Sequence, residues 1–328
     1  MSETINEVTG RSAQDDKKYA LSHGLLEPRR IVPKSRTGAW ILGAVVLVVL
    51  ASSLYTLLSR PALSWPVIWE YLFSPDIMSG LLITLYVTVI AMVLGLTFGL
   101  IAALMMGSKN PTLTAVASLY IWVFRAIPGL VQLLFWYNLA SLFPTLEIGI
   151  PYGPVFWQPN PNEFMTPLLA ACIALGVSEG AYMAEIIRAG LLSVSNGQRE
   201  AAAALGLTSG QALRRVVLPQ AMRTIIPPIG NSFIGMLKYT SLASVISVSE
   251  LLHSAQNIYA TNFQVIPLLI VASIWYLVVT SLLTLIQRQI ESYFNRGFDK
   301  RPPAQNKKVT LASVLFGSRR PVPFAPRS

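Results

Sequence analysis

Four charged side chains lie within or at the ends of long apolar stretches: Arg125, Glu179, Glu185 and Lys238. A charge at the centre of a bilayer costs about 2.5–3.5 kcal/mol on insertion scales, so such residues face protein or a water-filled path. One interpretation is that they line a polar path, together with Asn231, which lies seven residues before Lys238. The other is that internal ion pairs, such as Arg125 or Lys238 with Glu179, hold helices in register. Glu185 is best explained as the partner of Arg188, three residues later near a helix end.

Other kinds of chemistry find little support in the sequence. His23 and His253 are isolated, and the single cysteine, Cys172, lies in an apolar run. We therefore expect no metal site, no catalytic cluster and no intramolecular disulfide. The Gly-x4-Gly-Lys-Ser/Thr pattern of a nucleotide-binding loop does not occur, so we expect no ATP site in this chain.

The elements that must position these charges are apolar helices. The 328 residues are 53% hydrophobic and 12% charged, against roughly 25% charged in ordinary soluble proteins. This balance predicts an all-α polytopic membrane protein and excludes disordered, disulfide-rich and nucleic-acid-binding classes. About 20 apolar residues cross a bilayer. Six transmembrane helices are predicted: Trp40–Leu58, Gly80–Met106, Ala115–Phe143, Thr166–Ile187, Thr224–Val245 (the weakest) and Val265–Ile286.

Positive charge predicts the orientation of these spans. Of the 25 Lys and Arg residues, 22 fall in the two tails and in loops 107–114 and 188–223. Six spans with cytoplasmic N and C termini place all 22 on one side, as the positive-inside rule requires. The predicted parts are a cytoplasmic basic tail (1–39), an extra N-terminal helix (40–58), a transmembrane domain (71–293) and a second basic tail (294–328).

Small residues recur at four-residue spacing in two of the spans. They are Gly95, Gly99, Ala103 and Gly107 in one, and Gly176, Gly180 and Ala184 in the other. Small residues at this spacing let helices approach closely in lipid. We expect a packing role, either within the chain or between two copies.

The longest internal cytoplasmic loop, Arg188–Arg223, has a pattern of its own. Residues 200–205 are strong helix formers, and Gly206 adopts the left-handed conformation at little cost. The pattern predicts a short helix that ends at a glycine turn, then a helical stretch over 209–217 leading to Pro219. Local physics leaves open whether this is an ordinary loop or a docking element.

The spacing in this loop resembles the EAA motif of ABC importer permeases, which reads Glu-Ala-Ala, three residues, Gly, nine residues, Ile-x-Leu-Pro. The chain supplies Glu200-Ala201-Ala202, Gly206 and Val216-x-Leu218-Pro219. Further matching segments are Phe124-Arg125 with Pro128, Glu185–Gly190, Gly197-Gln198 and Leu237-Lys238. Over about Tyr71 to Tyr293 the chain resembles the polar amino acid (histidine/glutamine/arginine/opine) branch of that family. It departs from that branch at Ala126, Ile127 and Gly129.

The resemblance implies a five-helix permease core with one added N-terminal helix. In such importers the EAA loop forms a coupling helix that sits in a cleft of a separate ATPase. Glu200 would supply a surface anion, and Ala201 and Ala202 would allow close approach. The residues implied in ATPase coupling are Gly197, Gln198, Glu200, Ala201, Ala202, Gly206, Leu218 and Pro219.

The resemblance also implies partners and a location. The chain would be the permease subunit, not an enzyme, of an ATP-driven importer of polar amino acids in the bacterial inner membrane. Its partners would be a cytoplasmic ABC ATPase dimer, a periplasmic or extracellular solute-binding protein, a second permease copy or homologous permease, and membrane lipid, but no nucleic acid. ATP and Mg would bind the partner ATPase, with no cofactor in this chain.

The candidate translocation path, for a zwitterionic amino acid, consists of Arg125, Glu179, Asn231 and Lys238. An alternative from another class is an ion-coupled secondary transporter of amino acids, which predicts internal repeats and broken helices. No convincing repeat is present, and Glu179 is the sole candidate for an ion-coupled acidic site.

The stretch Ser241–Asn262 is too short and too polar to be another span. Four of its polar residues share one helical side: Glu250, His253, Gln256 and Asn257. It is either an external gate helix that faces the solute-binding protein or a plain interfacial helix.

Overall fold

The structure is a computed structural model that describes Ser22 and residues 37–143, 148–150 and 153–295. The two expected basic tails lie almost wholly outside these ranges. The chain divides into two units after Pro61. The first unit contains helix α2 (Thr37–Leu58), which covers the first predicted span. Its large apolar side chains are exposed within that unit, as suits a helix surrounded by lipid.

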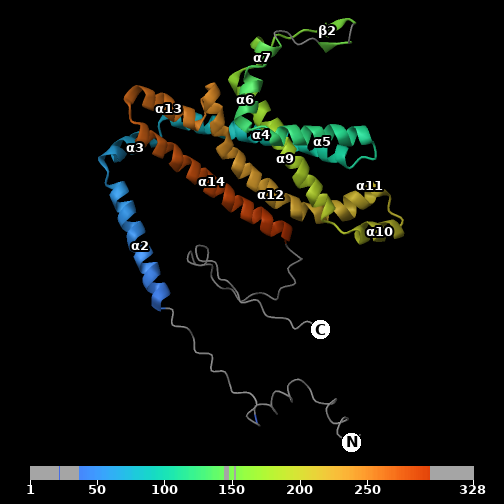
Figure 1. The fold of residues 1–328 in the computed structure, drawn as a ribbon, viewed down its shortest axis with the longest axis horizontal. Helices are drawn as coiled ribbons and strands as arrows, with labels where there is room; N and C mark the ends of the chain where they lie inside the picture. Colours follow the sequence, from blue (N-terminus) through green and yellow to red (C-terminus); the bar gives the residue numbers. More distant parts are fainter. Residues whose placement is uncertain (1–21, 23–36, 144–147, 151–152, 296–328) are drawn as a thin grey trace, which may run out of the picture. The chain divides into compact units, whose positions relative to one another are not determined.

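From Pro61 onwards the described chain is almost entirely helical (Figure 1). The helices in order are η1 (Pro61–Leu63), α3 (Trp65–Leu72), α4 (Pro75–Met106), α5 (Pro111–Ala126), α6 (Gly129–Tyr137), α7 (Leu139–Leu142), α8 (Pro161–Phe164), α9 (Pro167–Leu192), α10 (Asn196–Ala204), α11 (Ser209–Ala212), the π-helix η2 (Leu213–Val217), α12 (Leu218–Tyr239), η3 (Thr240–Ile246), α13 (Leu251–Asn262) and α14 (Val265–Asn295). Between α7 and α8, strands β1 (Ile148–Gly149) and β2 (Val155–Trp157) pair antiparallel.

Among the described residues, three helices are each long and apolar enough to cross a membrane: α4, α9 and α14. The number of spans rises to five at most when each bent helix pair is counted as one. The chain is therefore a predominantly helical, multi-pass membrane protein. The stretch predicted as a span over 224–245 comprises α12 followed by η3, and among the described helices it does not meet this test of length and apolar character.

The predicted span Ala115–Phe143 is not one straight helix, which corrects that expectation. It consists of α5 and α6, whose axes differ by 103°. The cause is Pro128, because a proline disfavours the helical region for the residue before it. Ile127 is accordingly extended, at φ −87° and ψ 129°. The Gln132 side chain donates to the carbonyls of Phe124 and Ile127, at 2.9 and 2.8 Å, and so satisfies groups freed by the break.

The two small-residue stripes bring α4 and α9 together. A Cβ atom added to Gly99 would lie 3.0 Å from the Ala184 nitrogen, and one added to Gly176 would lie 3.2 Å from the Ala91 oxygen. Ala184 and Ala91 are fully buried. The predicted packing role is therefore confirmed, and it operates within the chain.

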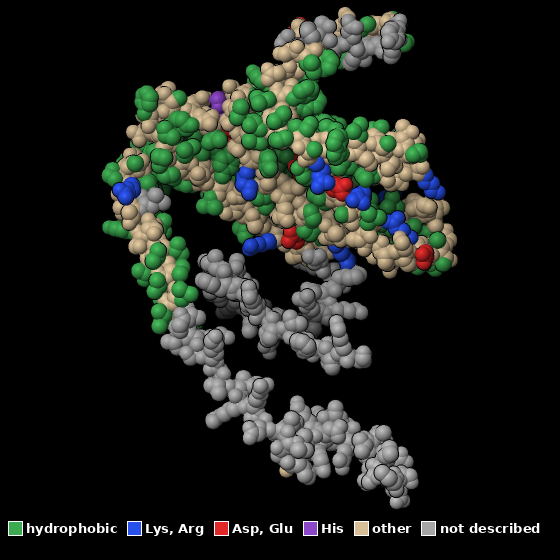
Figure 2. Space-filling view, in the orientation of Figure 1, with side chains coloured by type: hydrophobic (Ala, Val, Ile, Leu, Met, Phe, Trp, Pro, Cys, Tyr) green, Lys and Arg blue, Asp and Glu red, His purple; other side chains and the backbone are tan. Residues whose placement is uncertain are grey.

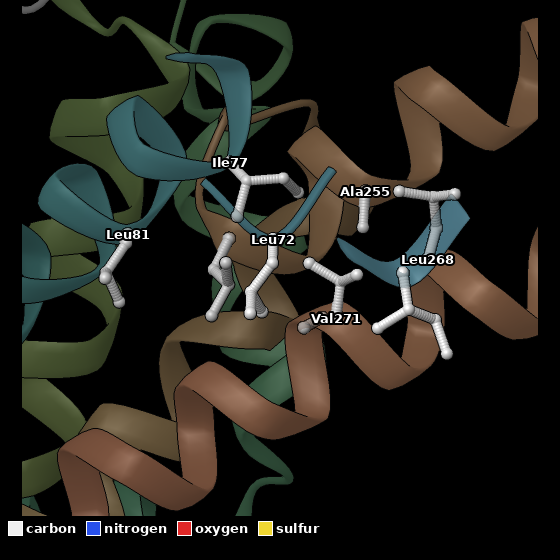
Figure 3. Packing of buried hydrophobic residues seen from close by; sticks show 9 residues of the cluster. Leu72, Ile77, Leu81, Ala255, Leu268 and Val271 are labelled. Atoms are coloured by element: carbon white, nitrogen blue, oxygen red, sulfur yellow. The ribbon is translucent and has the colours of Figure 1, made fainter. Parts of the chain in front are cut away.

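A second area of tight packing lies where α3, α4, α13 and α14 meet. Figure 3 shows apolar side chains from these helices converging, among them Ile77 of α4, Ala255 of α13 and Leu268 of α14. All three are fully buried. This apolar cluster fixes the short helix α13 against two long helices.

Much of the visible surface of this unit is apolar. Figure 2 shows hydrophobic side chains gathered over α4, α5 and α13, with few charged groups between them. Leu82 of α4 and Leu277 of α14 are each 66% exposed. Large apolar patches of this kind are rare on soluble monomers and mark surfaces that contact lipid or another protein.

Candidate functional site: the α10 loop and a polar cavity

Helix α10 carries the EAA-like residues and ends as the sequence predicts. Gly206 has a positive φ of 75°. Its N–H donates to the Ala203 carbonyl at 2.9 Å, and the N–H of Leu207 donates to the Ala202 carbonyl at 3.1 Å. These two bonds form a Schellman motif, which requires the left-handed residue that glycine supplies at least cost. The predicted short helix with a glycine turn is confirmed.

Most of the residues implied in ATPase coupling are exposed on α10, in the turn after it or at the start of α12. The exposed ones are Gly197, Gln198, Glu200, Ala201, Gly206, Leu218 and Pro219. Leu205, which the EAA pattern does not specify, is 81% exposed. Ala202 differs, because it is only 3% exposed. Its small side chain therefore lets α10 approach the chain's own helices and leaves the neighbouring face open.

Hydrogen bonds fasten α10 to the ends of the long helices beside it. The Arg199 guanidinium donates to the Leu191 carbonyl of α9 at 3.0 Å. The Gln220 amide of α12 donates to the Val216 carbonyl at 3.0 Å and to Gln198 at 3.4 Å. These bonds tie α10 to the C-terminal end of α9 and to the start of α12.

Those same two helices, with the break between α5 and α6, line a cavity of about 520 Å³. Arg125 and Glu179 both line it, and the Arg125 guanidinium lies 5.4 Å from the ring centre of Tyr182, a cation–π distance. The Ser232 side chain hydrogen-bonds the Glu179 carboxylate. Oε1 of Glu179 is buried without a hydrogen-bond partner among the described residues. The cavity is thus lined by a guanidinium group and a carboxyl group, and one oxygen of that carboxyl group has no hydrogen-bond partner among the described residues.

The structure separates the other two residues of the predicted path from this cavity. Asn231 turns towards α14, where its side chain accepts a hydrogen bond from Gln287 at 3.1 Å. Lys238 is exposed and does not line the cavity. Arg125 and Glu179 are brought together, whereas Asn231 and Lys238 lie elsewhere on α12.

The ion-pair interpretation is tested by the same geometry. Within the described part of the chain, the salt bridge within 4 Å is that of Glu185 with Arg188, at 2.8 Å. It is the helix-end pair expected from their spacing. No such bridge joins Glu179 to Arg125 or Lys238 there.

Several cavity residues were not found from the sequence. Tyr182, Ser232 and Tyr239 all line the cavity. A helical-face signal was available, because Tyr182 follows Glu179 by three residues and Tyr239 follows Ser232 by seven, spacings that place side chains on one face. Polar residues on one face of an apolar helix could have identified them.

The structure distinguishes Glu250 from the polar residues expected on the same helical side. Gln256 and Asn257 are at least partly exposed, whereas Glu250 is not. It is 0% exposed and forms the N-cap of α13. Burial raises the pKa of the Glu250 carboxyl above its ordinary value, while hydrogen bonds to the carboxylate act in the opposite direction.

The exposed EAA-like loop and the cavity lined by Arg125 and Glu179 between apolar helices agree with the transport permease that the sequence predicts. The chain belongs to the family described as binding-protein-dependent transport system inner membrane component, whose model matches residues 95–295. Its function is therefore that of an ABC importer permease subunit, as the EAA-like loop predicts. The family favours this over an ion-coupled secondary transporter.

Individual relatives agree with this membership. The chain is 40% identical over 272 residues to the arginine transport system permease protein ArgU of Corynebacterium glutamicum, covering 83% of this chain and 84% of ArgU. It is 34% identical to the glutamine transport system permease protein GlnP of Escherichia coli, over 69% of this chain and 95% of GlnP. In the crystal structure of an amino acid ABC transporter with histidines, one chain matches with a TM-score of 0.57 and 37% identity, over 67% of this chain and 95% of that one.

Proposed function

We propose that this permease carries a polar amino acid across the bacterial inner membrane and that the Arg125–Glu179 cavity receives it on the way. The observation that carries the proposal is the presence of both charges in one cavity of about 520 Å³. A free amino acid is a zwitterion and needs both kinds of partner. The relatives named for arginine and glutamine transport support this substrate class.

The two charges take different ends of the substrate. The Arg125 guanidinium binds the α-carboxylate, because its planar fork matches a carboxylate with two parallel hydrogen bonds. Oε1 of Glu179, which lacks a hydrogen-bond partner among the described residues, accepts from the α-ammonium group or from a cationic side chain. Lys238, exposed on α12, and Asn231 lie along the path beyond the cavity.

The assembly around this chain follows the family. Six spans with both termini in the cytoplasm form each permease, with α12 and η3 as the span in addition to the five that length and apolar character identify. A second copy or a homologous permease completes the pathway. A solute-binding protein delivers the substrate from outside. A cytoplasmic ATPase dimer binds ATP and Mg²⁺ and engages α10 through the exposed coupling residues. Closure of that dimer moves α10, and through the Arg199–Leu191 bond moves α9, which lines the cavity.

Reconstitution tests the proposal. The chain is placed in vesicles with its ATPase and solute-binding protein, and uptake of labelled amino acids and ATP hydrolysis are measured together. Uptake is expected to need all components and to fall at least about tenfold in Glu179→Gln and Arg125→Gln, since charged hydrogen bonds contribute about 1.5–3 kcal/mol. Glu163→Gln, at an exposed carboxylate outside the spans, is the matched control. Uptake without the ATPase would contradict the ATP-driven mechanism, and normal uptake by both cavity variants would contradict the site.

A further inference from the structure

Glu250 forms hydrogen bonds that have no part in the proposed translocation path. Its Oε1 accepts the N–H of His253 at 2.8 Å. Its Oε2 accepts both the N–H of Leu252 at 3.0 Å and the hydroxyl of Tyr276 at 2.9 Å. Tyr276 belongs to α14, so one carboxylate oxygen is shared between the start of α13 and a neighbouring long helix.

A second bond ties the same helix start to α4. The N–H of Leu251 donates to Oγ1 of Thr84 at 3.0 Å, across 167 residues of sequence. Thr84 is 0% exposed. The first N–H groups of a helix have no partner within the helix. In α13 they are satisfied by Glu250 and by Thr84 of α4.

The residues that make these polar contacts adjoin the apolar cluster of Figure 3, which contains Leu251 and Ala255 and has Tyr276 packed against it. Leu251 and Ala255 are fully buried. A buried polar network that is fully satisfied fixes one arrangement, and losing one member is costly in a low-dielectric interior. The titratable groups that face Glu250 are His253 on α13 and Tyr276 on α14; α4 contributes the neutral Thr84.

Helix α13 also has a suitable place in the chain for relaying movement. Through η3 it continues from α12, whose residues Ser232 and Tyr239 line the cavity. It then leads into α14. The segment therefore connects the cavity wall with the outer ends of α4 and α14.

We propose that Glu250 is a positioning residue for transport: its bond to Tyr276 holds α13 on α14 so that docking of the loaded solute-binding protein outside is transmitted to the cavity helices. The proposal rests on the proposed function for the docking partner. Its structural part, the fixing of α13 by a shared carboxylate oxygen, stands apart from the substrate.

Two variants separate this role from simple helix capping. Glu250→Asp keeps a good N-cap but shortens the reach to Tyr276, and Tyr276→Phe removes only the hydroxyl. Each should raise the concentration of loaded binding protein needed for half-maximal ATPase stimulation by about tenfold, as loss of one bond to a charged group would. The maximal rate should stay near that of the wild type. Glu70→Gln and Tyr86→Phe, both at exposed positions, should match the wild type.

Hydrogen exchange on the full chain in nanodiscs gives a readout that needs no partner. Amides of Leu251–Ser254 should exchange about tenfold faster in Tyr276→Phe, again the effect of one charged hydrogen bond, while α9 amides stay unchanged. The double variant should add little to either single one, because both remove the same contact.

The outcomes distinguish the failures. If no amino acid stimulates the wild-type complex, the proposed function fails, and exchange at α13 still decides the role of Glu250. If the stimulation profiles or α13 exchange of both variants equal the wild type, the positioning role is overturned. It is equally overturned if every loss is explained by the amount of folded protein.

Discussion

Two short helices, α10 and α13, sit in loops on opposite sides of the predicted topology and are attached to the long helices by opposite means. Helix α10 is held at its edges by the Arg199 and Gln220 side chains and ends at an exposed glycine. Helix α13 begins at a buried carboxylate within an apolar cluster. The contacts of α10 leave one of its faces exposed. Those of α13 satisfy the polar groups at the start of the helix.

The difference shows where each helix can exchange partners. Leu205 beside the α10 turn is 81% exposed, whereas Glu250 at the start of α13 is 0% exposed. An exposed helix such as α10 can bind and release another protein without exposing the hydrophobic core. A helix whose start is buried, such as α13, moves only together with the helices that surround it. Each variant below should therefore affect coupling or stability according to the end at which it lies.

The largest effect is expected for Glu200→Lys on α10. Glu200 is exposed, so folding and membrane abundance should stay unchanged. Reversing a charge at a protein–protein contact costs several kcal/mol, which corresponds to about a hundredfold or greater loss of coupled uptake. Uptake and ATP hydrolysis in vesicles measure it, with Glu200→Gln as the intermediate case. Full coupling by the Lys variant would show that α10 is not the coupling element.

Thr84→Val should have the next largest effect, and on stability. The change keeps the shape but leaves the buried N–H of Leu251 without its acceptor, a loss of about 1–3 kcal/mol. Thermal unfolding of the purified chain checks this. Thr84→Ser, which keeps the hydroxyl, should remain close to the wild type. Thr97→Val, at an exposed position on the same helix, should change stability little. If both valine variants behaved alike, the contrast between the two helices would be lost.

Gly206→Val, in the turn that follows α10, should have a smaller effect. An added Cβ would meet no atom within 4 Å, so the cost comes only from the φ of 75°. A left-handed non-glycine residue costs about 1–2 kcal/mol, and we expect about a tenfold loss of ATP-coupled uptake. Gly206→Asn is the control, because asparagine tolerates this conformation better. Equal losses in both would point to the side chain rather than the backbone.

The contrast also explains what the sequence could predict. The end of α10 depends on local signals, a run of helix formers and one glycine, and it was predicted correctly. The four-residue spacing predicted close packing of small residues, but it did not show that α4 and α9 pack on each other within the chain. The bend between α5 and α6 was missed although Pro128 was seen, because the expected span was drawn through it.

The burial of Glu250 could not be predicted in this way. Its partner Tyr276 lies 26 residues away, and the Thr84–Leu251 bond joins positions 167 residues apart. Helical periodicity groups Glu250 with other polar residues on one side of the helix. It carries no information on which other helix packs against that side. Only the packing of α4 and α14 around the start of α13 removes the carboxylate from solvent.

The smallest effect is expected for Gln220→Ala. Its bond to Gln198 is long, at 3.4 Å, and both side chains are at least partly exposed. Its bond to the Val216 carbonyl, at 3.0 Å, is local to one helical turn. Neutral bonds contribute about 0.5–1.5 kcal/mol even when well made, so both unfolding and uptake should change by less than about twofold to threefold. A larger loss of uptake with normal stability would mean that α10 moves α12 through this side chain. In that case α10, like α13, would depend on one specific polar contact.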